Sequence, residues 1–192
     1  MGLPLFDLVP DLDTLENACS QCQKCGLARR RTNVVFGHGS RTTKLMFVGE
    51  APGFFEDQEG LAFVGKSGRL LDEVLAELDL TRADVYTANT LKCRPPRNRD
   101  PENSETEACR PWLAAQIAAL RPTVVVALGR RASAWFGMAG TVAALRGRPQ
   151  ASILGPVVVP TWHPAAVLRD AAGSKRAQFK ADLQAAIALC LE

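Results

Sequence analysis

The segment KLMFVGEAPG, residues 44–53, joins a run of apolar residues to a polar turn. Residues 44–49 are almost continuously apolar, which is the pattern of a strand that is buried on both faces of a sheet. Similar runs occur at DVYTANT (84–90), TVVVALG (123–129) and PVVVPTWH (156–163). We therefore expect buried strands in these four segments to form the centre of the fold.

Helical patterns separate these runs. In SGRLLDEVLAELDL (67–80) the apolar residues form one stripe. SETEACRPWLAAQIAAL (104–120) opens on Ser104 and Glu107, which suggest a capping box, and Pro111 is expected to kink or restart this helix. The tail, residues 174–192, predicts another amphipathic helix. Strands that alternate with helices predict an α/β fold whose parallel sheet is covered on both faces.

The 192 residues suit one domain, and no linker divides them, so we expect a single domain over 1–192. No apolar run approaches the roughly 18 residues of a membrane span. The start, MGLPLF, lacks the features of a signal peptide and of a myristoylation site. We therefore expect a cytoplasmic protein, in which the six cysteines bind metal or act in catalysis rather than form disulfides.

The predicted strand ends carry unusual residues. In a parallel α/β sheet, ligands bind beyond the carboxyl ends of the strands. One strand ends in GEAPG (49–53), another leads into NTLKCRPPRNRD (89–100), and the last leads into WHPAAVLRD (162–170). A carboxylate, a carboxamide and an imidazole should therefore meet at one edge of the sheet.

Three cysteines, Cys19, Cys22 and Cys25, lie three residues apart, and Cys93 and Cys109 follow further along the chain. A C-x-x-C pair completed by two isolated cysteines could build a four-thiolate site for zinc or an iron–sulfur cluster. The alternative is ordinary buried thiols. Cys19 also fits the apolar face of a helix. A redox role for the C-x-x-C pair is disfavoured because no strand precedes it.

Cys190, on the apolar stripe of the last helix, also fits a buried position. The net charge is only +3, but the basic residues cluster at 29–31, 92–99, 146–148 and 169–176. This asymmetry is typical of one basic face that meets nucleic acid. Solvated arginines spread over the surface are an equal alternative on charge alone.

Five segments together carry a family resemblance. They are CQKCGLARRRTNVVFG (22–37), VGEAPGFFEDQEGLAFVGKSGRLLD (48–72), VYTANTLKCRPPRNRDP (85–101), EACRPWL (107–113) and TWHPAAVLR (161–169). In this order they resemble the family 4 uracil-DNA glycosylases, which are bacterial and archaeal enzymes with an iron–sulfur cluster. The resemblance extends over residues 19–190.

The resemblance implies a three-layer α/β/α sandwich around a four-stranded parallel sheet. It also implies a DNA repair enzyme that acts, as a monomer, on single- or double-stranded DNA containing uracil. Such an enzyme flips deoxyuridine out of the DNA and hydrolyses its N-glycosidic bond, which leaves an abasic site for base excision repair. The implied cofactor is a [4Fe-4S] cluster held by Cys22, Cys25, Cys93 and Cys109, the first two on an N-terminal arm (11–36). Cys19 and Cys190 fall outside this set.

The resemblance also implies roles in uracil binding. Phe63 would stack on the base, and the Asn89 carboxamide would distinguish uracil from cytosine. Glu56 would exclude the methyl group of thymine, and the backbone at Ala51 would face the base. His163 would donate a hydrogen bond to O2 as negative charge develops there.

Glu50 would stabilise the positively charged sugar or orient the attacking water. Other classes place a water-activating Asp or Asn where this chain has Ala51, so the group that activates the water stays open. For the other residues a structural role is the alternative: a core position for Phe63, a turn for Asn89 and a solvated acid for Glu56.

For DNA binding, the backbone and side chains of Lys66 and Ser67 at a helix start would suit a phosphate. Val167 or Leu168 would enter the emptied base stack as a wedge. The implied contacts to the DNA backbone are Arg97, Arg99 and Arg169. Plain surface positions are the alternative for the basic residues.

Other functions fit less well. A covalent uracil-DNA binder of the same superfamily needs a nucleophilic histidine in the loop after the second strand, and KCRPPRNRDP (92–101) has none. A non-catalytic DNA-binding module would not need Glu50, Asn89 and His163 together. Electron transfer through a cluster would need a partner-cofactor motif, and we find none. Phe54 and Phe55 depart from the acidic residues usual in family 4, as Trp162 does from its usual Tyr or Phe.

Overall fold

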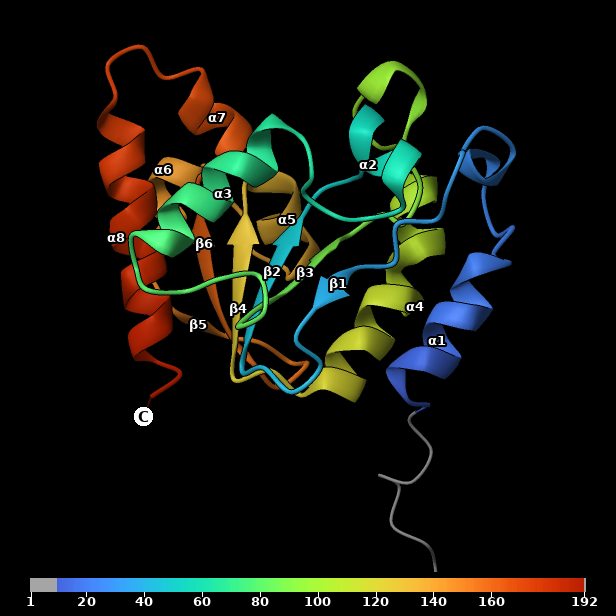
Figure 1. The fold of residues 1–192 in the computed structure, drawn as a ribbon, viewed down its shortest axis with the longest axis horizontal. Helices are drawn as coiled ribbons and strands as arrows, with labels where there is room; N and C mark the ends of the chain where they lie inside the picture. Colours follow the sequence, from blue (N-terminus) through green and yellow to red (C-terminus); the bar gives the residue numbers. More distant parts are fainter. Residues whose placement is uncertain (1–9, 192) are drawn as a thin grey trace, which may run out of the picture.

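The computed structural model describes residues 10–191, so the N-terminal positions considered for a signal peptide and myristoylation lie outside the described residues. The centre of the molecule is a six-stranded sheet in the order β1-β3-β2-β4-β6-β5 (Figure 1). The strands are β1 (His38–Gly39), β2 (Leu45–Gly49), β3 (Tyr86–Asn89), β4 (Val124–Leu128), β5 (Gln150–Ala151) and β6 (Val157–Thr161).

The inner four strands, β3, β2, β4 and β6, pair in parallel and confirm the four predicted strand segments. The expected count of four strands is wrong, because β1 and β5 add antiparallel edges. These edge strands have two residues each, too few to show an alternating pattern. At the β1 edge the backbone of Gly39 lies very close to the chain beside β3. A Cβ at Gly39 would lie 2.1 Å from the Val85 carbonyl oxygen, so a glycine is needed there.

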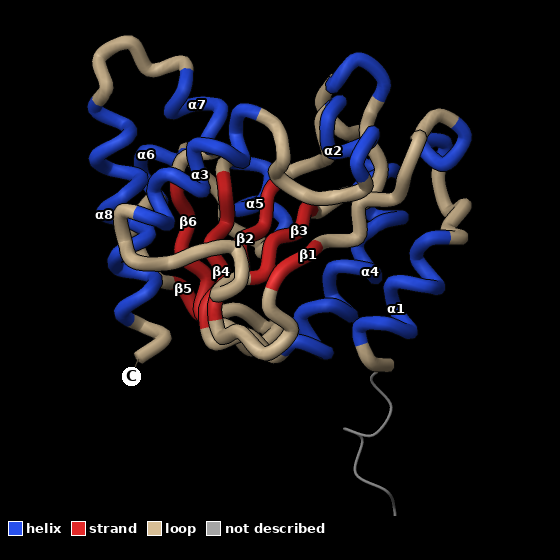
Figure 2. The backbone as a smooth tube through the Cα atoms, viewed as in Figure 1, coloured by secondary structure: helices blue, strands red, loops and turns tan. Residues whose placement is uncertain are grey.

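Helices cover both faces of the sheet, which confirms the three-layer arrangement (Figure 2). The helices are α1 (Leu12–Ser20), α2 (Phe54–Glu59), α3 (Lys66–Ala76), α4 (Asn103–Leu120), α5 (Arg130–Trp135), α6 (Val142–Leu145), α7 (Pro164–Leu168) and α8 (Ser174–Ala188), with 3₁₀ turns η2 (Gly26–Arg29) and η3 (Pro96–Asn98). Leu45 and Phe47 of β2 pack with α3, α7 and α8, whereas Met46 and Val48 pack with α1, α4 and α5.

Helix α4 begins differently from the prediction. Its N-cap is Glu102, whose N–H donates to the Glu105 carboxylate at 2.9 Å, so the predicted Ser104–Glu107 capping box is wrong. Arg99 also binds Glu105, which favours this register, while Glu107 pairs with Arg110 instead. The helix does not restart at Pro111 but continues to Leu120. After the proline, Leu113 and Ile117 pack on the sheet, whereas Cys109 before it packs with Leu27, Leu91 and Cys93.

The apolar stripe of α3 is buried as predicted, through Leu70, Leu71, Val74 and Leu75. Cys190 lies just after α8 and packs, partly buried, against the same core. Among residues 10–191, no helix combines the length and the apolar character needed to cross a membrane.

Candidate active site and thiol cluster

A cleft with an empty volume of about 1140 Å³ lies at the carboxyl ends of the parallel strands. It brings together residues that the sequence placed on three strand ends and on the loops that follow them. The predicted site residues that line it are Glu50, Ala51, Glu56, Phe63, Ser67, Asn89, Arg99, His163 and Arg169.

Asn89, the last residue of β3, is 2% exposed. Its Nδ2 is buried and has no hydrogen-bond partner among the described residues. A buried donor left unpaired costs roughly 1–3 kcal/mol, so this amide is suited to meet a ligand that enters the cleft. It is not the turn residue bonded to its own backbone that the sequence left as an alternative.

Gly49 makes room for this arrangement. A Cβ at Gly49 would lie 2.5 Å from Asn89 Oδ1 and 2.5 Å from the Phe63 ring. Only a residue without a side chain therefore lets the carboxamide and the aromatic ring approach the end of β2 together. Sequence reasoning missed this role, and its only signal was a glycine directly before Glu50.

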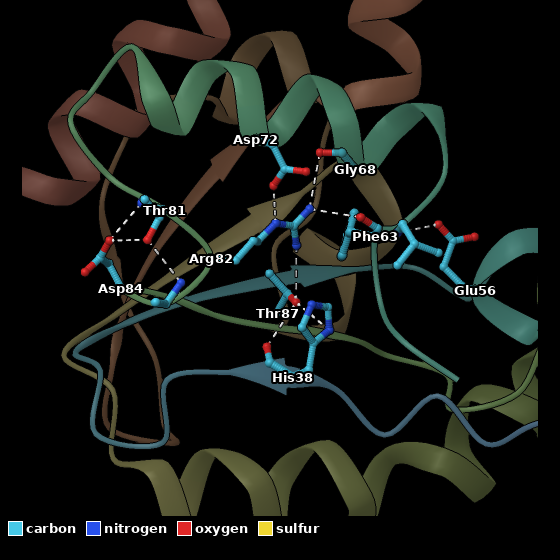
Figure 3. Close-up of polar contacts among 11 residues, drawn as sticks. His38, Glu56, Phe63, Gly68, Asp72, Thr81, Arg82, Asp84 and Thr87 are labelled. Carbon is cyan, nitrogen blue, oxygen red and sulfur yellow. Dashed lines mark hydrogen bonds and ion pairs between the residues drawn. The ribbon is translucent and has the colours of Figure 1, made fainter. Parts of the chain in front are cut away.

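Phe63 is buried at the cleft with its backbone in the left-handed region (φ 59°). Its ring centroid lies 6.4 Å from that of His163, with 32° between the ring planes. Arg82 stabilises the turn between Phe63 and Gly68. Its guanidinium donates to the carbonyls of Phe63 (2.9 Å) and Gly68 (3.2 Å) and forms an ion pair with Asp72 (Figure 3). Phe63 therefore belongs to the core and also lines the cleft.

Glu56 of α2 is a buried carboxylate, not a solvated acid. It accepts hydrogen bonds from the backbone N–H groups of Gly53 (3.0 Å), Val64 (3.1 Å) and Gly65 (2.8 Å). These three hydrogen bonds fix the Glu56 carboxylate in place, where it forms one wall of the cleft.

His163 follows β6 and caps α7. Its Nδ1 accepts the N–H of Ala165 at 3.1 Å, so the neutral ring carries its proton on Nε2. Burial lowers the pKa of His163 to about 4, which keeps the ring neutral near pH 7. Gly129, at φ 87°, lies against it: a Cβ there would be 2.9 Å from the His163 Cβ.

Glu50 and Ala51 follow β2 on the floor of the cleft, and both are half-buried. Burial raises the pKa of Glu50, and the nearby Arg131 only partly opposes this effect. The carboxylate is therefore a stronger base than a solvated glutamate.

The residues expected to meet DNA divide into two groups. Ser67 and Arg169 line the cleft, and Lys66 is exposed beside it. Val167 is only 7% exposed and packs in the core, so of the two candidate wedges only Leu168, 51% exposed, is available to a partner.

Two arginines of the proline-rich loop are placed differently from each other. Arg99 lines the cleft, but its guanidinium already binds Glu102 and Glu105. Arg97 is exposed and does not line the cleft. Asn98, which sequence reasoning missed, does line it, and both Arg97 and Asn98 have left-handed backbones (φ 56° each).

Phe54 packs on the same loop. The Arg94 guanidinium lies 5.0 Å from the centre of the Phe54 ring and donates to Asn98 Oδ1 at 2.6 Å. Phe54 and Phe55 also contact each other edge to face at 5.5 Å, and both remain about half exposed. The aromatic departure at 54–55 therefore lies beside the cleft-lining loop.

Five cysteines line a second, small cavity: Cys19, Cys22, Cys25, Cys93 and Cys109. Three of the sulfurs accept hydrogen bonds from N–H groups. The Trp112 indole donates to Cys22 (3.3 Å), Arg31 to Cys93 (3.4 Å) and the backbone of Lys92 to Cys109 (3.3 Å). Such donors stabilise thiolate sulfur, so this lining suits thiolate ligands.

Cys19 differs from the other four. It lies on α1 and is fully buried in the core with Leu12 and Leu15. Burial raises the pKa of Cys19 to about 12, and it also raises the pKa of Cys109, to about 11. Over residues 10–191, no three His, Cys, Asp or Glu side chains are placed to hold one metal ion. The thiols surround a cavity instead of converging on one point.

Comparison with known proteins agrees with this geometry. Residues 36–187 match the family model of the Uracil DNA glycosylase superfamily. A Type-4 uracil-DNA glycosylase from Thermotoga maritima is 41% identical over 177 residues, which cover 91% of this chain and 92% of that protein. One from Archaeoglobus fulgidus is 43% identical over 165 residues, 82% of this chain and 83% of that protein. The chain therefore belongs to the uracil-DNA glycosylase superfamily.

Proposed function

We propose that this protein is a type-4 uracil-DNA glycosylase, which hydrolyses the bond between uracil and deoxyribose in DNA and so begins base excision repair. Relatives of that name, similar over most of the chain, support the activity. The observation that carries the proposal is the unpaired, buried Nδ2 of Asn89, in a cleft that also holds Phe63 and the neutral His163.

Base recognition follows from the cleft. Flipping a nucleotide out of a duplex costs a few kcal/mol, and stacking on Phe63 returns roughly 1–3 kcal/mol. Asn89 Nδ2 donates a hydrogen bond to uracil O4, and its Oδ1 accepts one from N3–H, a pattern that cytosine reverses. Glu56 closes the side next to C5, and its three backbone hydrogen bonds keep it from swinging away to admit a methyl group.

Bond cleavage follows from His163 and Glu50. As the glycosidic bond breaks, its electron pair moves onto the uracil, and the sugar becomes oxocarbenium-like. The Nε2–H of His163 donates to O2 of the leaving anion, and a preorganised donor of this kind contributes about 3 kcal/mol. The Glu50 carboxylate stabilises the cationic sugar and takes a proton from the attacking water, because Ala51 has no group for that task.

The four cysteines Cys22, Cys25, Cys93 and Cys109 would hold a [4Fe-4S] cluster. The N–H groups that donate to three of their sulfurs support this ligand set. When bound, the cluster supplies a structural cross-link. Its ligands would join the N-terminal arm to α4 and to the loop that follows β3. Iron and sulfide analysis of the purified protein, with its visible absorbance, separates this cofactor from zinc.

We propose that the chain binds DNA as a monomer, with Ser67 and Arg169 on phosphates and Leu168 as the wedge.

The test of the glycosylase activity uses a single-stranded oligonucleotide with one deoxyuridine, which is treated with alkali after incubation with the protein. We expect free uracil and a cut strand, and no cut in a matched strand with thymidine. No product from cluster-containing protein contradicts the proposal, and a covalent protein–DNA adduct would favour the binder alternative.

A further inference from the structure

Lys92 follows β3 and is only 1% exposed. Burying an ammonium group is costly unless its hydrogen bonds are satisfied. Here Nζ donates to the carbonyl oxygen of Asn89 (2.9 Å) and to Gln116 Oε1, and it lies 5.8 Å from the centre of the Phe36 ring. Both acceptors are neutral, and within residues 10–191 no carboxylate forms an ion pair with Lys92.

The partner of Lys92 on α4 is itself fixed. Gln116 is fully buried, and its Nε2 donates to the carbonyl of Phe36 at 2.9 Å and to the hydroxyl of Tyr86 at 3.2 Å. Since Tyr86 belongs to β3, the lysine and the glutamine form a polar bridge between α4 and this strand. The bridge therefore leaves the Lys92 ammonium little freedom to move.

Lys92 also contacts the thiol cavity, because its backbone N–H donates to the Cys109 sulfur at 3.3 Å and the next residue is Cys93. One residue thus touches both proposed sites: its side chain reaches back to Asn89, and its backbone meets a proposed cluster ligand. The chain bends between Asn89 and Lys92, so the ammonium binds the peptide that directly follows the base-reading residue.

We propose that Lys92 is a positioning residue that fixes the Asn89 carboxamide for uracil and ties it to the thiol cluster. This inference rests on the proposed function. The Asn89 side chain leaves the backbone where β3 ends, so the orientation of that peptide sets where Nδ2 points. A misplacement of about 1 Å in such a group can cost on the order of a hundredfold in rate.

The test compares Lys92→Met, which keeps an unbranched chain but removes the N–H donors, with Lys180→Met. Lys180 pairs with Glu77 on the surface and serves as the matched control. We expect Lys92→Met to lower kcat/KM on uracil-containing DNA by roughly tenfold to a hundredfold. Lys92→Met should keep its iron content and visible spectrum, and it should bind abasic DNA as the wild type does. It should lose the uracil-dependent affinity, which is the difference between its affinities for uracil-containing DNA and for abasic DNA. Lys180→Met should resemble the wild type in every measurement.

The inference is overturned if Lys92→Met keeps its cluster and retains wild-type kcat/KM and uracil-dependent affinity. Should Lys92→Met fail to fold or to load iron, Gln116→Met releases the ammonium from α4 and leaves Lys92 in place. The same loss of uracil-dependent affinity in that variant supports the inference, and wild-type behaviour overturns it. Failure of the wild-type protein to release uracil would instead count against the proposed function.

Discussion

Asn89 has a buried amide donor that a bound ligand could satisfy. Its buried Nδ2 has no partner within residues 10–191, so the free protein carries the cost of an unmade hydrogen bond. Sequence spacing placed a carboxamide at a strand end, but it could not show that the amide would be left unpaired. That property depends on which side chains surround it after folding.

We predict that Asn89→Ala lowers kcat/KM for uracil release by roughly tenfold to a hundredfold, because two hydrogen bonds of about 1 kcal/mol each are lost. Its thermal stability should not fall in proportion, because Nδ2 has no partner among the described residues. Kinetic assays and thermal unfolding of the same preparation check both parts. A large drop in melting temperature would show that Asn89 serves the fold.

His163 carries a pH dependence whose sign follows from its pKa. The folded pKa, about 4, lies below the ordinary value of 6.5, so the unfolded chain binds the proton more readily. The folded state therefore loses stability as the pH falls from about 6.5 to about 4, and it loses none above that window.

Urea titrations give the free energy of unfolding of the wild type and of His163→Asn. The wild-type value minus the variant value should decrease as the pH falls from about 6.5 to about 4. Other titrating groups are common to both proteins and cancel in the difference. A difference that stays constant from pH 4 to 7 would show that His163 is not held neutral by burial.

At the scale of elements, the cleft forms where β2, β3 and β6 end at one edge of the sheet (Figure 1). Each strand supplies one group of different chemistry, and glycines such as Gly49 and Gly129 allow these groups to approach. Helix α2 adds the Glu56 wall, and the turn held by Arg82 adds Phe63 (Figure 3).

Gly49→Ala should lower kcat/KM on the order of a hundredfold, because the added Cβ would lie 2.5 Å from both Asn89 Oδ1 and the Phe63 ring and must displace one of them. Gly26→Ala is the control, since no atom lies within 4 Å of the added Cβ. Steady-state kinetics on uracil-containing DNA, with circular dichroism to confirm the fold, distinguish the two. Equal activities would mean that the strand ends adjust freely.

Across the whole molecule, the second cavity gathers cysteines from α1 and the segment after it, both in the N-terminal arm, from the loop after β3, and from α4. A cluster held by four of them would therefore restrain the arm beside the cleft-lining loop.

Cys22→Ser should remove the iron and increase hydrogen exchange in the arm, because a ligand of the cross-link is lost. Cys19→Ala should retain the iron and lose only some stability, since Cys19 packs in the core. Iron analysis and exchange measured by mass spectrometry check both variants. Loss of iron from Cys19→Ala alone would reassign the ligand set.

Much of this arrangement could be predicted from the chain itself. The apolar runs at 44–49 and 123–129 identified central strands, because burial on both faces leaves a local pattern of apolar residues. Pairing across two-residue edges leaves no such pattern, and β1 was missed for that reason. The Ser104 cap was also predicted wrongly, because the contact of Arg99 with Glu105 and the bond from the Glu102 N–H to Glu105 favour a different start for α4.

The layers, the strand ends and the chemical groups on them could be predicted from the sequence, because they follow from local periodicity and from the geometry of parallel sheets. The folded structure was needed to show that Val167 is buried while Leu168 is exposed, and that Lys92 meets Gln116 of α4. Burial and such hydrogen bonds depend on residues far apart in the chain. Their positions are known only when the whole chain has packed.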